Sequence, residues 1–124
     1  MDPSTDNRTF YHQEHREWLS TLDFYQDEIK FFQNELALIL HANMSSMSIL
    51  EHADEYKLIF RKKLETLDEL RHSIVKHDGS LADNSKDDVG IDTSHDHVRK
   101  EYETFKENFD LMKQNFKRFA AKND

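Results

Sequence analysis

The chain has 124 residues, of which 36% are hydrophobic and 34% are charged, and its formal net charge is −8. This length predicts one domain with a modest core, and the acidic balance opposes binding to nucleic acid or to anionic membranes. The absence of cysteine excludes disulfides, thiolate metal ligands and a cysteine nucleophile.

The first predicted element is a long helix over residues 9–43, preceded by a flexible tail over residues 1–8. Apolar and aromatic residues recur in this stretch with alternating spacings of four and three, which indicates a heptad seam on one helix face. Its members are Tyr11, His15, Trp18, Leu22, Tyr25, Ile29, Phe32, Leu36 and Ile39. The helix is expected to end near "HANMSS", where Asn43 and the serines favour local side-chain hydrogen bonds.

The second predicted helix covers residues 48–77. Ser48 and Glu51 have the spacing of a capping box, so the helix is expected to begin there. Its stripe is less regular than the first one, because the pattern drifts at Lys63 and Leu64, and the facing of the helix beyond this point is left open. The stripe comprises Ile49, Ala53, Tyr56, Phe60, Lys63 or Leu64, Leu67, Leu70, Ile74 and His77.

A long loop over residues 78–92 is predicted next, because both glycines and many Asp, Asn and Ser residues lie there. It does not fit a calcium-binding EF-hand loop. A template that begins at Asp83 places Asp88 where the glycine should be and Ser94 where the bidentate glutamate should be.

The third predicted helix covers residues 93–121 and has the most regular seam. Its members are His95, Val98, Tyr102, Phe105, Phe109, Met112, Phe116 and Phe119. Short connections between helices make neighbours antiparallel, so the three elements predict an all-α, up-down-up bundle with coiled-coil-like seams. A second copy of the chain could complete this bundle.

The first helix has more apolar surface than its seam requires. Phe24, Phe31 and Leu38 repeat every seven residues on a different face, and we call these three residues the ridge. Two interpretations remain open. The ridge belongs to a broad core in which the first helix is central, or it forms an interface for a homodimer or for another protein.

The eight histidines suggest a second possible site. An up-down-up topology brings His15, His77 and His95 to one end of the bundle on the core stripes, with His12 beside them. Neutral imidazoles suit zinc, iron, copper or nickel, and the interior of a helical bundle can hold such a metal. Alternatively, these rings lie in a partly solvated end layer, where their nitrogens are satisfied by hydrogen bonds or bridge to water, or they make that layer sensitive to pH.

The function predicted from the sequence is that of a small protein interaction module, which binds itself or another protein through a helix face. The alternative is a metal-binding bundle with zinc or iron as cofactor. No catalytic motif was found, so an enzyme is not expected. Partners are expected to be proteins rather than nucleic acid or membrane. No signal peptide or apolar run of roughly 20 residues is present, so the protein is expected to be cytoplasmic.

Overall fold

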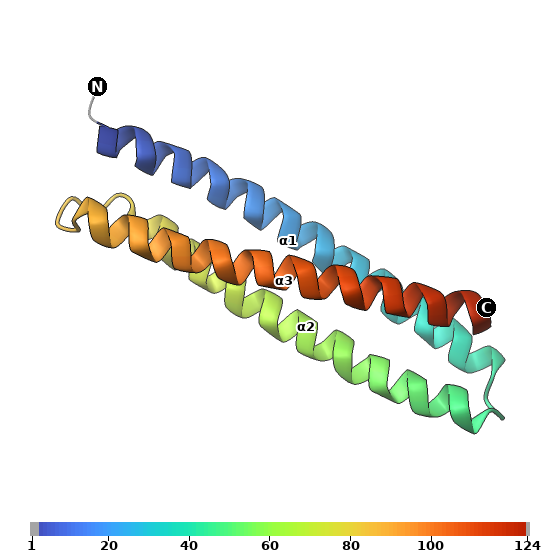
Figure 1. Ribbon diagram of the computed structural model, residues 1–124. Helices are drawn as coiled ribbons and strands as arrows, with labels where there is room; N and C mark the ends of the chain where they lie inside the picture. Colours follow the sequence, from blue (N-terminus) through green and yellow to red (C-terminus); the bar gives the residue numbers. More distant parts are fainter. Residues whose placement is uncertain (1–2, 124) are drawn as a thin grey trace.

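The computed structural model describes the backbone of residues 3–123 and the side chains of residues 7–123. It contains three helices, α1 (Pro3–Ala42), α2 (Met47–Ser80) and α3 (Asp88–Asn123), and each helix packs against the other two. The helices run up, down and up (Figure 1). The prediction of an all-α bundle of three long helices is therefore confirmed.

The start of α1 and the α2–α3 connection lie at one end of the bundle, opposite the α1–α2 connection and the end of α3 (Figure 1). We call the first of these the histidine end, because it holds the side chains described below. None of the described helices combines the length and the apolar character that crossing a bilayer requires.

The predicted seams form the core. Every predicted seam residue of α1 from His15 to Ile39 is buried, and α3 is buried along its predicted stripe. At its last turn Ala120 is buried and Phe119 is only partly so. The far half of α2 keeps its register beyond Lys63, because Leu67, Leu70 and Ile74 are all buried. The irregular spacing at Lys63 and Leu64 therefore does not change which face of α2 points to the core.

Two predicted helix boundaries are wrong. α1 begins at Pro3 rather than at residue 9, so residues 3–8 of the predicted tail are helical; the remaining tail residues 1–2 lie outside the described residues. Proline suits the first turn of a helix, where its missing N–H is not needed. α2 begins at Met47, and its cap is Ser46 rather than Ser48, because the Ser46 side chain accepts a hydrogen bond from the amide of Ile49.

The predicted loop over 78–92 is also too long, because the connection between α2 and α3 covers only residues 81–87. Leu81, the first residue of the connection, and Ile91, in the first turn of α3, are both buried. The amide of Gly90 donates to Asp87 Oδ1, which caps α3 earlier than predicted. A Cβ atom at position 90 would lie 2.8 Å from that oxygen, which favours glycine there.

Arg8 fastens the start of α1 to this connection. Its guanidinium donates to the carbonyl oxygens of Leu81 at 2.8 Å, Asp83 at 3.2 Å and Lys86 at 2.9 Å. It also forms an ion pair with Asp88 at 3.3 Å. The sequence composition near Arg8 is polar and suggested a tail, whereas these long-range bonds hold the segment in the helix.

Candidate metal centre

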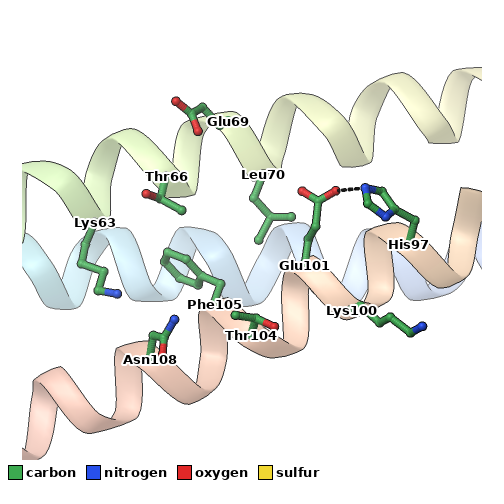
Figure 2. A pocket seen from close by; sticks show the side chains of 10 residues that line it. All are labelled: Lys63, Thr66, Glu69, Leu70, His97, Lys100, Glu101, Thr104, Phe105 and Asn108. Atoms are coloured by element: carbon green, nitrogen blue, oxygen red, sulfur yellow. Dashed lines mark ion pairs between the residues drawn. The ribbon is translucent and has the colours of Figure 1, made fainter.

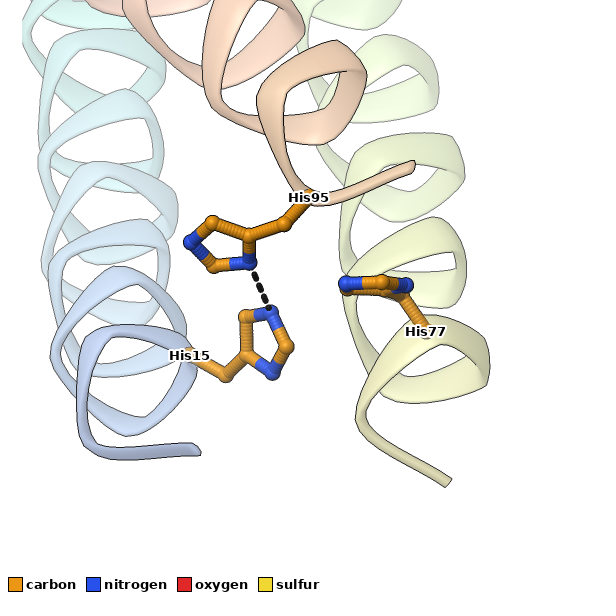
Figure 3. A group of neighbouring side chains, drawn as sticks. All are labelled: His15, His77 and His95. Atoms are coloured by element: carbon orange, nitrogen blue, oxygen red, sulfur yellow. Dashed lines mark hydrogen bonds between the residues drawn. The ribbon is translucent and has the colours of Figure 1, made fainter. Parts of the chain in front are cut away.

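Three histidines from three helices meet inside the histidine end. His15 of α1, His77 of α2 and His95 of α3 occupy seam positions at matching heights, and all three side chains are buried. Their ring centroids lie between 5.0 and 5.5 Å apart. Figure 3 shows the three rings projecting from their separate helices into one shared space. We call these three residues the histidine cluster.

Aromatic rings enclose His95 within the cluster. Tyr11 stacks on His95 with centroids 3.7 Å apart, and Trp18 stacks on the same ring with centroids 5.1 Å apart. Trp18 in turn stacks on Tyr102, one layer deeper in the core. The predicted partly solvated end layer is therefore wrong for His15 and His95, because neither residue has measurable exposure.

Ring nitrogens of the cluster converge. One nitrogen from each residue lies within 4.8 Å of the corresponding nitrogens of the other two. The closest pair is His15 Nε2 and His95 Nδ1, 3.2 Å apart (Figure 3). A zinc ion bound at about 2.0–2.1 Å holds tetrahedral nitrogens about 3.4 Å apart, so this pair already has suitable spacing.

Carboxylates hold the outer nitrogens of two of these rings. Asp78 Oδ1 lies 2.8 Å from His15 Nδ1, and Glu14 Oε1 lies 2.8 Å from His95 Nε2. Arg99 also donates to Glu14 Oε1 at 2.8 Å. Burial raises the pKa of Asp78, but hydrogen bonds from His15 and His12 outweigh it and lower that pKa overall.

These contacts decide which ring nitrogens carry hydrogen. An ionised carboxylate can only accept, so His15 Nδ1 and His95 Nε2 must be the donors. A neutral imidazole has one N–H, which leaves lone pairs on both His15 Nε2 and His95 Nδ1. These two atoms can share a hydrogen bond only if one ring takes a second proton. Without that proton the two lone pairs face each other at 3.2 Å, an arrangement that a metal ion bound to both nitrogens would stabilise.

His77 supplies the third inward-facing imidazole. Its Nε2 atom is buried and has no hydrogen-bond partner. Burial, followed by the neighbouring rings of His15 and His95, lowers the pKa of His77 to about 4. Burial likewise lowers the pKa of His95, although Glu14 opposes this effect. His77 and His95 are therefore poor sites for an extra proton, while neutral imidazole nitrogens are good metal ligands.

The other histidines predicted near this end do not join the cluster. His12 is half exposed, and its Nδ1 contacts Asp78 Oδ1 at 2.8 Å, the same oxygen atom that His15 contacts. His72 and His97 are exposed. His12 is thus placed as a partner of Asp78 and not among the converging nitrogens, so the structure brings together three of the four histidines predicted as ligands.

Sequence reasoning missed the part that Arg99 has in the site. It lies one helical turn after His95, so the i,i+4 spacing on α3 was the available signal. The sequence shows Glu14 and Asp78 only as neighbours of His15 and His77. Each carboxylate nevertheless bonds to a cluster histidine of another helix, Glu14 to His95 and Asp78 to His15. Only the packing of the helices determines these pairs.

The ridge is a separate surface feature on α1. Phe24, Phe31 and Leu38 are 60%, 64% and 70% exposed, so the core does not cover them. The interpretation of a broad core around α1 is therefore wrong for these three residues. Exposure by itself does not identify what, if anything, binds there.

Comparisons of the chain with protein-family models, with curated proteins and with solved structures find no match.

Proposed function

We propose that this protein is a metal-binding helical bundle, in which His15, His77 and His95 hold one divalent transition-metal ion. One observation carries the proposal: ring nitrogens of three buried imidazoles converge, and the buried Nε2 atom of His77 has no hydrogen-bond partner among the described residues. An unpartnered buried polar atom costs about 1–3 kcal/mol, and a metal ion bound to His77 Nε2 would remove this cost.

The surroundings of the cluster support the same proposal. Metal-bound histidines usually donate their other N–H to a carboxylate, which fixes the tautomer and orients the ring. Asp78 has this relation to His15, and Glu14 has it to His95. Nitrogen ligands without thiolate suit zinc, copper, nickel or iron, and zinc is the natural first probe because imidazole binds it well.

A zinc titration tests this proposal. The protein is purified without an affinity tag and treated with EDTA. We expect one Zn²⁺ per chain by elemental analysis after reloading, and a melting temperature raised by roughly 5–15 °C when Zn²⁺ is about 100 times its Kd. The melting temperature should rise because the ion binds the folded chain and has no comparable site in the unfolded chain.

The matched control is His72→Ala, which removes an exposed histidine from the same helix as His77. This variant should bind zinc with unchanged stoichiometry and show the same rise in melting temperature. Absence of stoichiometric zinc in the unaltered protein, with no shift in melting temperature, would refute a metal-binding function.

We also propose that the ridge supports self-association, as a second candidate function. Phe24, Phe31 and Leu38 are equally spaced along α1, so an antiparallel second copy would place Phe31 against Phe31 and Phe24 against Leu38. Such a pairing is self-complementary, as a twofold dimer requires. Burial of each large apolar side chain contributes on the order of 1.5–3 kcal/mol, which could offset part of the association cost.

The substitution Phe31→Glu tests the dimer. The unaltered protein should show a mass that rises with concentration by light scattering, whereas Phe31→Glu should remain monomeric and folded. The matched control is Leu111→Glu, because Leu111 is similarly exposed at 59% but lies on α3. A strictly monomeric unaltered protein at high micromolar concentration would exclude the dimer.

A further inference from the structure

The described residues supply three converging ligands to the proposed metal. The carboxylates of Glu14 and Asp78 hold ring nitrogens of the cluster and do not belong to the group of converging atoms. Zinc prefers four ligands, and sites with three protein ligands keep the fourth position for water or an exogenous molecule. The donor set described here is therefore that of an incomplete coordination sphere.

A groove between α2 and α3 opens next to this incomplete sphere. His77 lines the groove as well as belonging to the cluster, and it is the one cluster residue with any exposure, at 7%. Ser80 and Ser94 line the same groove with their hydroxyl groups. A small solute in the groove thus reaches an edge of one metal ligand without crossing the packed core.

The charges in this groove favour an anion. Lys76 and Lys86 line it, although the whole chain has a formal net charge of −8. Its acidic residue Glu101 forms an ion pair with His97 at 2.8 Å. Figure 2 shows this pair, which also borders the next stretch of the α2–α3 surface towards Lys63. The two lysines have no ion pair of this kind among the described residues.

The charge of the proposed metal site points in the same direction. Three neutral imidazoles leave the full double positive charge on the ion, and Arg99 offsets one of the two nearby carboxylates. A fourth ligand that carries a negative charge would therefore be favoured over a neutral one, because it reduces the uncompensated charge in a buried site.

Resting on the proposed metal-binding function, we propose that the bound metal keeps one exchangeable coordination position, and that this position takes a small monodentate inorganic anion admitted through the groove beside His77. The ligand binds directly to the metal through one donor atom and displaces water. Lys76 and Lys86 raise the local concentration of the anion at the mouth of the groove.

Cobalt and azide provide the test. Co²⁺ replaces Zn²⁺ in the full-length protein, and its visible absorption reports the number and kind of ligands. We expect the spectrum of four-coordinate Co²⁺, and a saturable change in that spectrum when millimolar azide is added. Dialysis should show that the cobalt remains bound throughout the titration.

The outcomes separate this inference from the function on which it rests. If no protein-bound Co²⁺ spectrum appears, the metal-binding function itself fails. If the Co²⁺ spectrum appears but azide leaves it unchanged, or strips the metal from the protein, then the exchangeable position is refuted and the metal-binding function stands.

A pair of lysine variants tests the access route. The double variant Lys76→Gln/Lys86→Gln should weaken azide binding by roughly two- to tenfold through the loss of two nearby charges, while Co²⁺ remains bound with the same spectrum. The matched control is Lys100→Gln, since Lys100 lies in the neighbouring stretch shown in Figure 2 and not in the groove beside His77. Equal azide affinity in all three proteins would overturn the proposed route.

Discussion

Replacing His77 with leucine should stabilise the metal-free protein by about 1–3 kcal/mol and lower its affinity for Zn²⁺ more than about 100-fold. The stability gain follows because leucine fills the buried position without the unpartnered Nε2 atom. The affinity loss follows because one of three ligands disappears, and even the loss of a partner that only orients a ligand costs 10- to 100-fold. Urea unfolding of EDTA-treated protein and a competitive zinc titration measure the two effects.

The opposite signs of these two effects distinguish a metal ligand from a structural histidine. If His77 were a well-packed structural residue, its replacement should lower the stability of the protein and leave zinc binding unchanged. His72→Leu is the matched control on the same helix, and it should change neither quantity because His72 is exposed. Retention of zinc affinity by His77→Leu would remove His77 from the proposed ligand set.

Replacing Phe109 with alanine should lower the free energy of unfolding by about 3–5 kcal/mol. Phe109 is fully buried and stacks on Tyr25 with ring centroids 4.2 Å apart. The substitution removes the transfer free energy of the ring and leaves a cavity that long, regular helices cannot easily close. Linear extrapolation from a urea titration gives the change.

Phe31→Ala is the matched substitution on the surface. Phe31 is 64% exposed, so the folded monomer should change in stability by less than about 0.5 kcal/mol. A larger loss that grows with protein concentration would indicate that Phe31 is buried between two copies. Similar losses for Phe109→Ala and Phe31→Ala at low concentration would contradict the core described here.

The heptad pattern was sufficient to predict the fold because buried positions dominate it. Seam residues such as Leu22 and Phe116 are fully buried, and the spacing that reveals them requires no knowledge of other helices. The start of α1 was harder to predict, since contacts distant in sequence hold it in place. Arg8 is an example, because its bonds to Leu81 and Lys86 keep the start of α1 next to the α2–α3 connection.

The three cluster histidines could be predicted because topology and register alone bring His15, His77 and His95 to one end. The chemistry of the cluster could not. It depends on which ring nitrogens form hydrogen bonds with Asp78 and Glu14, and on the hydrogen bond from Arg99 to Glu14. Side-chain geometry determines these bonds. For the same reason the sequence could not tell that His12 would contact the same Asp78 oxygen as His15.

The position of Trp18 has a practical consequence. It is the single tryptophan of the chain, and it stacks on His95 while its ring centroid lies 5.4 Å from that of His15. The indole fluorescence of the whole protein therefore originates beside the histidine cluster. A paramagnetic ion held by these imidazoles would quench that emission at very short range, so the chain contains its own optical reporter for the occupancy of the site.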